Sequence, residues 1–207
     1  MLMSDSHLFA FVLASAAIIV APGPAQALVL ARTLSEGRRA GVLTAVGLNV
    51  GTIVHAMAAG LGLSAILATS AAAFLVVKYL GAAYLLYLGI VAIRGASTRP
   101  PDACSSAAGG TIRRAIVTGI LNPKVAVFFL AFLPQFVHPA AGPIFIQCLL
   151  LGTLLAAMDI AYESGLAWLA GAATKWLAAP AVTAWRERIT GGVLIGLGVR
   201  LALTERD

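Results

Sequence analysis

Six long apolar runs, separated by short polar connections, limit what this chain can fold into. A helix needs about 20 apolar residues to cross the hydrocarbon core of a bilayer, which is about 30 Å thick. The runs extend over residues 8–31, 40–67, 71–93, 115–137, 144–173 and 189–203. We therefore predict an all-α integral membrane protein with six transmembrane helices, of which the last is the shortest.

The composition excludes the other main classes of protein. Of the 207 residues, 60% are hydrophobic and 11% are charged, whereas a soluble domain has about 45–50% apolar and about 25% charged residues. A soluble chain of this length cannot bury so much apolar surface, and a disordered chain needs the opposite composition. Cys104 and Cys148 are far apart and form no CxxC motif, so we predict no metal site and no cofactor.

The basic residues indicate how the chain is oriented in a membrane. Most lysines and arginines lie in the connections that follow the first, third and fifth runs, whereas the connections near Ser70 and His138 contain none. No aromatic residues interleave with them, so we interpret the net charge of +6 as a topology signal and predict no nucleic-acid partner. The positive-inside rule places the three basic connections in the cytoplasm and both termini outside.

The six runs divide into two halves of three within a single transmembrane domain of residues 1–207. Half one covers about residues 1–94, a cytoplasmic loop covers 95–114, and half two covers about residues 115–207. Because each half has an odd number of helices, the two halves insert in opposite orientations. This arrangement predicts an inverted 3+3 repeat.

Proline interrupts the first run of each half. The first run contains Pro22-Gly23-Pro24, and the fourth run contains Asn122-Pro123. Paired interruptions at corresponding positions indicate the binding site of an inverted-repeat transporter. Proline leaves carbonyls without a helical donor, and a half-helix that starts after proline offers free N–H groups to an anion. We therefore predict that the proline-broken helices one and four form a binding site.

Ionisable side chains inside the apolar runs are a second sign of a site, because charge within a membrane is costly and functional by default. Lys124 lies about ten residues, or about 15 Å, into the fourth run. Asp159 lies near the middle of the fifth run, and Glu163 follows four residues later on the same helix face. Asn49 and His55 share the second run, but a separation of about 600° puts them on different sides of that helix. These groups and the proline breaks predict a polar cavity near the midplane.

An α-amino acid is one ligand that such a cavity fits. Its carboxylate would bind the helix end or Lys124, and its ammonium would bind the free carbonyls or Asp159. Four alternatives remain open: Lys124 and Asp159 form a structural ion pair, Glu163 lies at the cytoplasmic interface, His55 is a packed histidine, and Asn49 links helices.

Four motifs occur in order along the chain. They are Ala-Pro-Gly-Pro at residues 21–24, a glycine-rich second run that includes His55, the segment 78–89, and Gly-Ile-Leu-Asn-Pro-Lys at residues 119–124 followed by Pro-Gln-Phe at 134–136. With these motifs the chain resembles, essentially end to end, the LysE/RhtB-type amino-acid exporters of the lysine exporter superfamily. The resemblance implies a six-helix homo-oligomeric exporter in the bacterial inner membrane, with both termini periplasmic. It also implies that the proton gradient drives export of amino acids or close derivatives.

The residue pattern and the resemblance together define the predicted site. The predicted substrate-binding residues are Pro22, Gly23, Pro24, Gln26, Asn49, His55, Asn122, Pro123 and Lys124. Asp159 and Glu163 are predicted to couple proton movement, because a carboxylate in a low-dielectric environment can carry a proton at useful pH. Asp159 is the better candidate of the two. The predicted partners are a small amino acid, protons and membrane lipid, and no catalytic residue is predicted.

Glu163 departs from the family pattern. The segment Tyr162-Glu163-Ser164 has an acid where the resemblance leads us to expect an apolar or aromatic residue. The difference points either to a substrate with an extra positive charge or to a different proton site.

Three other functions compete with amino-acid export. A divalent-cation exporter of the same superfamily needs clustered metal ligands, and only Asp159 and Glu163 cluster. An intramembrane enzyme needs a nucleophile–base pair or a carboxylate dyad on separate helices, whereas these two carboxylates share one helix. A purely structural membrane protein does not explain two broken helices and midplane charges. We therefore predict a transporter and not an enzyme.

Overall fold

A computed structural model gives the fold of the chain and describes residues 5–21, 23–69, 71–94, 111–170 and 180–203. These residues form helices joined by short turns and contain no strand. The elements are α1 (Asp5–Val20), α2 (Pro24–Glu36), α3 (Arg38–Thr69), α4 (Ala71–Ile93), α5 (Thr111–Ile120), α6 (Pro123–Val127), the π-helix η2 (Phe128–Phe132), the 3-10 turns η3 (Leu133–Gln135) and η4 (Pro139–Ala141), α7 (Ile144–Leu169) and α9 (Pro180–Leu203). The prediction of an all-α protein is confirmed for this part of the chain.

Two helices are long and apolar enough by themselves to cross a membrane, namely residues 38–62 of α3 and the whole of α7. Two bent pairs, α1 with α2 and α5 with the residues up to Gln135, each qualify as one more crossing, so the described residues contain up to four. Large apolar side chains such as Leu61, Leu130 and Leu150 are exposed on the outside of these elements. An apolar exterior of this kind suits lipid better than water.

The starts of two helices differ from the sequence prediction. The sequence predicts a polar connection over residues 175–188, but α9 already begins at Pro180, because proline is favoured in the first turn of a helix. Similarly, α5 begins at Thr111, so Arg113 and Arg114 lie exposed in its first turns instead of in the predicted loop. Apolar content marks where a helix can contact lipid, and polar turns extend the helix beyond that part. Residues 95–110 of the predicted loop lie outside the described residues.

The first predicted break lies between α1 and α2, which are bent by 57° relative to each other. α1 ends at Val20, and the extended Gly23 (φ −167°, ψ 174°) precedes α2. In a regular helix the carbonyls of Ile18 and Val20 would accept hydrogen bonds from residues 22 and 24, and both of these are prolines without an N–H. The helical hydrogen bonds therefore stop here, and the carbonyl of Ile18 needs another donor.

The second predicted break lies after α5, where the chain bends by 41°. Asn122 caps α6, because its side-chain Oδ1 accepts a hydrogen bond from the backbone N–H of Lys124 at 3.1 Å. Pro123 takes the first helical position, where its missing N–H costs no hydrogen bond. Beyond Val127 the helix widens into η2, which brings Phe128, Phe129 and Phe132 into the main apolar core.

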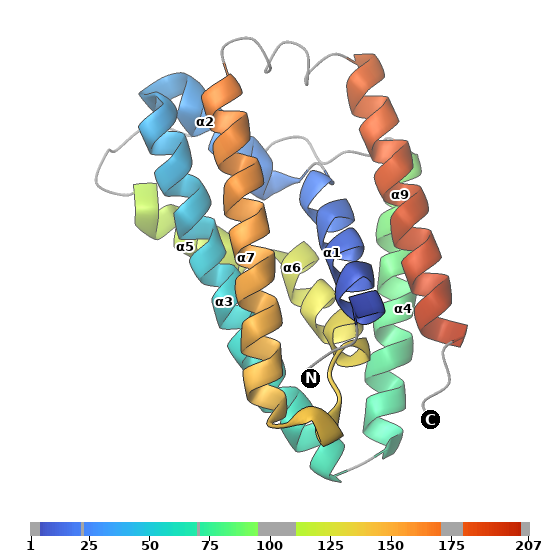
Figure 1. Ribbon diagram of the computed structural model, residues 1–207. Coiled ribbons are helices and arrows are strands. Elements are labelled where there is room, and N and C mark those ends of the chain that lie inside the picture. The colour runs from blue at the N-terminus through green and yellow to red at the C-terminus, as the bar shows by residue number, and fades with distance from the viewer. Residues whose placement is uncertain (1–4, 22, 70, 95–110, 171–179, 204–207) are drawn as a thin grey trace.

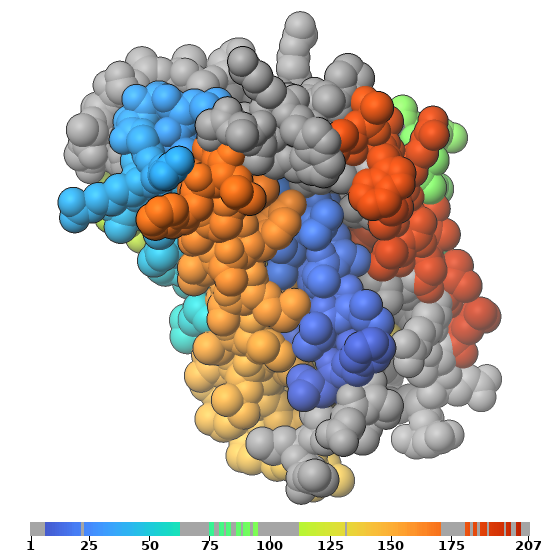
Figure 2. All heavy atoms as spheres, turned by 45° about the horizontal axis from the view of Figure 1, so that its top comes forward, coloured from blue at the N-terminus to red at the C-terminus, as the bar shows by residue number. Residues whose placement is uncertain are grey.

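Two long helix pairs enclose the broken helices. α3 packs along α7 and α4 packs along α9, and α1, α6 and η2 lie between these pairs in Figure 1. α5 packs against α3, and Figure 2 shows α1 at the surface between α7 and α9. The two breaks come together inside the bundle, where residues from both line one cavity.

The two ends of the bundle differ in composition. The ends of α2, α4 and α7 and the start of α9 lie at one end in Figure 1, and the start of α1 and the end of α9 lie at the other. Basic residues gather at the first end, where Arg32 pairs with Glu36 and the Arg38 guanidinium lies 5.6 Å from the ring centre of Trp168. At the second end the rings of His7 and His138 stack with their centres 5.3 Å apart.

Glycine allows close contact between helices at two crossings. A Cβ atom on Gly51 would lie 2.2 Å from the backbone carbon of Gly119, where α3 crosses α5. A Cβ atom on Gly89 would lie 2.7 Å from the carbonyl oxygen of Gly191, where α4 crosses α9. These crossings fix the positions of α5 and α9 relative to the long helices, because no larger residue fits without separating the backbones.

Candidate functional site

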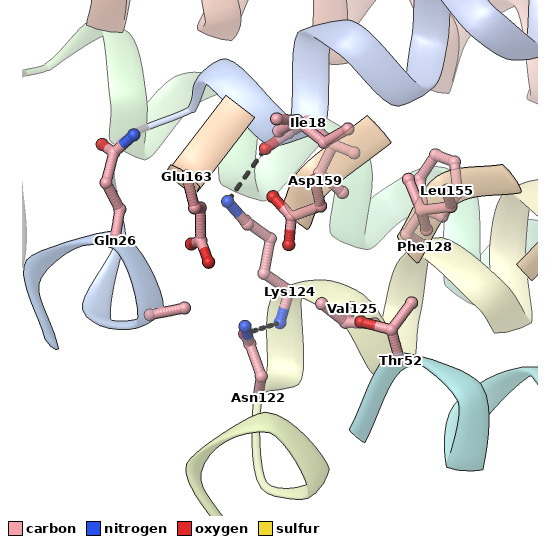
Figure 3. Close-up of a pocket in the computed structure, with 12 residues that line it drawn as sticks. Ile18, Gln26, Thr52, Asn122, Lys124, Val125, Phe128, Leu155, Asp159 and Glu163 are labelled. Carbon is pink, nitrogen blue, oxygen red and sulfur yellow. Dashed lines mark hydrogen bonds between the residues drawn. The ribbon is translucent and has the colours of Figure 1, made fainter. Parts of the chain in front are cut away.

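A cavity lies where the two helix breaks face α7. Its empty space is about 430 Å³, a figure that includes the part that is open to the outside. The lining residues come from both halves of the chain and are Ile18, Ile19, Ala25, Gln26, Thr52, Asn122, Lys124, Val125, Phe128, Leu155, Asp159 and Glu163. Most of the wall is apolar, and the charged groups converge at one point (Figure 3).

Lys124 is tied to the end of α1. Its Nζ donates to the carbonyl oxygen of Ile18 at 2.8 Å and to that of Ala21 at 3.0 Å. These carbonyls lie at the first break, so the lysine supplies donors that the prolines do not. Because Lys124 belongs to half two and α1 to half one, a single side chain connects the two breaks.

Asp159 is on α7, where it lies opposite Lys124, and it is half-buried. Its Oδ2 accepts a hydrogen bond from Nδ2 of Asn49 at 3.0 Å, and the same Nδ2 also donates to the carbonyl of Ala45 at 3.1 Å. The predicted group Asn49 therefore positions the carboxylate from α3 and does not line the cavity itself. Lys124 is close enough to Asp159 for its charge to attract the carboxylate.

Glu163 lies one helical turn beyond Asp159 and is only 3% exposed. Its Oε2 has no hydrogen-bond partner among the described residues, although the side chain lines the cavity. Figure 3 shows the side chain of Lys124 between those of Glu163 and Asp159, and its charge attracts both. The structure therefore places Glu163 in the charged cluster with Lys124 and Asp159.

Residues at the first helix break lie next to the charged cluster of Lys124, Asp159 and Glu163. Gln26 is buried on α2 and its Nε2 donates to the hydroxyl of Tyr162 on α7 at 3.1 Å. A Cβ atom on Gly23 would lie 3.6 Å from Nζ of Lys124, so this glycine adjoins the ammonium. Pro24 starts α2 beside it, whereas the predicted site residue Pro22 lies outside the described residues. At the second break, Pro123 starts α6 between two residues that line the cavity.

The predicted site residue His55 lies away from the cavity, and the polar lining residue Thr52 is absent from the prediction. His55 does not line the cavity, because its position on α3 is turned away from that of Asn49. Thr52 does line it and is buried. Its position three residues after Asn49, on the same face of the helix, is the signal that identifies it in the sequence.

Hydrogen-bond acceptors dominate the cavity. Two carbonyls at the end of α1 and the carboxylates of Asp159 and Glu163 face one charged donor among the described lining residues, which is Lys124. The N–H group of Lys124, which the sequence predicts to be free for an anion at the start of α6, is taken by the side chain of Asn122. The cluster is therefore suited to bind a group that carries N–H donors and positive charge.

The fold and the cavity define a helical membrane protein with a charged internal site between two broken helices. A family model described as "LysE type translocator" matches residues 16–205, and the chain belongs to this family.

Relatives of known sequence cover nearly the whole chain. This chain is 32% identical over 196 residues to the homoserine/homoserine lactone efflux protein of Salmonella typhimurium. The match covers 94% of this chain and 95% of that protein. This chain is 28% identical over 189 residues to the leucine efflux protein of Salmonella paratyphi A, covering 89% of each. An uncharacterized membrane protein of Vibrio cholerae is 31% identical over 203 residues, covering 96% of this chain and 98% of that protein. No solved structure matches the chain.

Proposed function

We propose that this protein exports small amino acids or close derivatives across the bacterial inner membrane, by proton antiport through a site near the midplane. The observation that carries the proposal is the cavity in which both helix breaks meet two carboxylates and one lysine. Paired breaks with unsatisfied backbone groups are the arrangement in which inverted-repeat transporters bind substrate.

The relatives support a substrate that carries an α-ammonium group. Two of them are named for efflux of homoserine, homoserine lactone or leucine. These three compounds share the α-amino group, whereas the lactone has no free carboxylate. An acceptor-rich cavity recognises the feature that the three compounds have in common, and its apolar walls leave room for different side chains.

The proposal includes six spans in two inverted halves. Each half consists of a broken helix, a long helix and a further helix, in the same order. Each unbroken helix packs along its counterpart, α3 along α7 and α4 along α9. Arg32 and Arg38, which follow the first broken helix, lie at one end of the bundle, which favours a cytoplasmic position for that end and periplasmic termini.

Proton coupling is assigned to the two carboxylates of α7. Asp159 and Glu163 adjoin the cavity from one face of the helix, and both interact with the charge of Lys124. Protonation of one carboxylate lowers the negative charge around a bound ammonium and so weakens its binding. Proton entry from the periplasm would then promote release of substrate on that side.

The first experiment is a counterflow screen in proteoliposomes with radiolabelled amino acids and an imposed pH gradient. We expect accumulation of one or a few small amino acids, and we expect the part of it that the pH gradient drives to be lost in Asp159→Asn and in Lys124→Ala. The absence of a signal for every amino acid would refute the proposal. A parallel screen with cadmium and manganese tests the second candidate, a divalent-cation exporter, which the pairing of Asp159 and Glu163 favours.

A further inference from the structure

We propose that the ammonium of Lys124 occupies the substrate's own ammonium site when no substrate is bound, and that the substrate displaces it. The site consists of the carbonyls of Ile18 and Ala21 together with the carboxylates of Asp159 and Glu163. This inference rests on the proposed function, because it identifies which atoms bind the amino group of the exported compound.

The carbonyl pair needs a donor in every state of the protein. Ile18 and Ala21 are buried, and proline at position 22 removes the N–H that would bond to Ile18. A buried carbonyl without a hydrogen-bond partner is destabilising, so an empty site with two such carbonyls is unfavourable. Lys124 satisfies both at 2.8 and 3.0 Å, which is the coordination a primary ammonium ligand would also make.

Charge balance leads to the same conclusion. Two carboxylates on one face of α7 need a nearby cation in a low-dielectric site, and Lys124 interacts with both. A substrate ammonium in place of the lysine keeps one cation within the cluster. The displaced lysine is then free to pair with the substrate's carboxylate, where the compound has one. The unpartnered Oε2 of Glu163 provides a further acceptor for the incoming group.

Displacement of the Lys124 ammonium also breaks two hydrogen bonds between the two halves of the chain. Lys124 belongs to α6, and its two acceptors are the carbonyls of Ile18, in the last turn of α1, and of Ala21, directly after it. Substrate binding would therefore remove two hydrogen bonds between the halves when the site is filled, while the apolar contacts of α1 with Phe128 and Val125 remain. One face of α1 lies at the surface between α7 and α9 (Figure 2), and its other face packs in the main apolar core.

The test compares ligand affinities of the purified protein and of Lys124→Met by calorimetry. The probe is homoserine lactone, which has the ammonium but no carboxylate, and the matched control ligand is N-acetylhomoserine lactone, which lacks the ammonium. A site that is free for about a tenth of the time or less binds about tenfold more weakly than one that is always free. We therefore expect Lys124→Met to bind the lactone about tenfold more tightly or better, and neither protein to bind the acetylated control.

Tetramethylammonium separates hydrogen bonding from charge, because it is a cation without N–H donors. Loss of the lysine charge favours both cations, but we expect tetramethylammonium to gain less affinity from Lys124→Met than the lactone does, since the two carbonyls cannot form hydrogen bonds to it. A weaker lactone affinity in Lys124→Met, an equal gain for tetramethylammonium, or no lactone binding to either protein would each overturn the inference. Amino-acid counterflow by the wild-type protein in those cases would leave the proposed function standing.

A second measurement serves if Lys124→Met does not fold. In a background of Cys104→Ser and Cys148→Ala, Lys124→Cys is treated with aminoethyl methanethiosulfonate, which rebuilds a side chain of nearly lysine length with a terminal ammonium. Homoserine lactone should slow this labelling, measured by mass spectrometry, because both ammonium groups need the same carbonyls. Equal labelling rates with lactone and with its acetylated analogue would contradict the proposal.

Discussion

Three charged side chains meet in the cavity, namely those of Lys124, Asp159 and Glu163. Lys124 bonds to the end of α1 and attracts both carboxylates, while Asn49 holds Asp159 from α3. Removing one member leaves a buried charge or a buried carbonyl without its partner, which is more costly than never having had the group. Substitutions of Lys124 and Asp159 should therefore leave folding intact only when shape and hydrogen bonding are kept, whereas Glu163, whose Oε2 has no partner among the described residues, is an exception.

Asp159→Asn keeps the shape and removes the charge. The new amide oxygen can still accept the hydrogen bond from Asn49, so the protein should insert and purify in normal yield. We expect accumulation driven by a pH gradient to fall to the level of empty liposomes, while exchange at equal pH on both sides continues, because exchange needs no net proton movement. Proteoliposome uptake in the two modes measures this, with Asp159→Glu as the control that keeps the carboxylate. Normal accumulation by Asp159→Asn would contradict its role in proton coupling.

We expect Glu163 to lower the stability of the folded protein while it contributes to transport. Its buried Oε2 lacks a hydrogen-bond partner among the described residues, so we expect Glu163→Met to stabilise the protein by about 1–2 kcal/mol. That gain corresponds to a rise of about 2–4 °C in melting temperature per kcal/mol for a chain of this size. Transport should fall at the same time, since the cavity loses an acceptor.

Glu187 on α9 provides the matched control for this prediction. It is also buried, with an unpartnered oxygen among the described residues, but it does not line the cavity. Glu187→Met should therefore raise the melting temperature without loss of transport. A decrease in transport in both variants would mean that the effect of Glu163→Met is not specific to the cavity.

Among the elements, α6 depends most on a single residue for its start. Asn122 is its cap, and the helix has no more than five regular residues before it widens into η2. Asn122→Ala leaves the N–H of Lys124 without its acceptor and should lower the free energy of unfolding by about 1 kcal/mol. Asn122→Asp and Asn122→Ser restore a capping oxygen and should recover most of the loss in a thermal unfolding assay in detergent. An equal loss in all three variants would show that the cap is not the reason.

The crossing of α3 and α5 depends on the absence of side chains. A Cβ atom on Gly51 would lie 2.2 Å from the backbone of Gly119, so Gly51→Ala must push the two helices apart. We expect a clear loss of thermal stability and of transport, because α5 carries the second break. Gly62 on the same helix has nothing within 4 Å of its Cβ position, so Gly62→Ala should be neutral or stabilise by about 0.5–1 kcal/mol. Equal melting temperatures of the two variants would contradict this interpretation of the crossing.

At the scale of the whole molecule, features that depend on neighbouring residues could be predicted from the sequence. Contacts between residues far apart in the chain could not. Both breaks follow from proline, whose effect on the preceding turn is local, and the pairing of Asp159 with Glu163 follows from helical spacing. The contact of Lys124 with α1 joins residues more than one hundred positions apart, so only packing determines it. The apolar run predicts a later start for α9 than the structure shows, because apolar residues mark the lipid-facing part of a helix and not its polar first turns.

Orientation in the membrane is the last property that the arrangement of the whole chain predicts. His7 and His138 contact each other at one end of the bundle, with 3.2 Å between Nδ1 and Nε2, while Arg38 lies at the other end. If the basic end is cytoplasmic, both histidines lie in the periplasm. In the background without Cys104 and Cys148, a membrane-impermeant maleimide added to cells with a permeabilised outer membrane should label His7→Cys.

Under the same conditions Arg38→Cys should be labelled only after the inner membrane is opened. The double variant His7→Cys/His138→Cys adds an independent readout, because the periplasm is oxidising and the cytoplasm is not. We expect it to form a disulfide in growing cells, detected as a faster-migrating band that a reducing agent removes. External labelling of Arg38→Cys, together with a reduced histidine-site pair, would place the basic end outside. That result would reverse the direction in which the cavity must release its substrate.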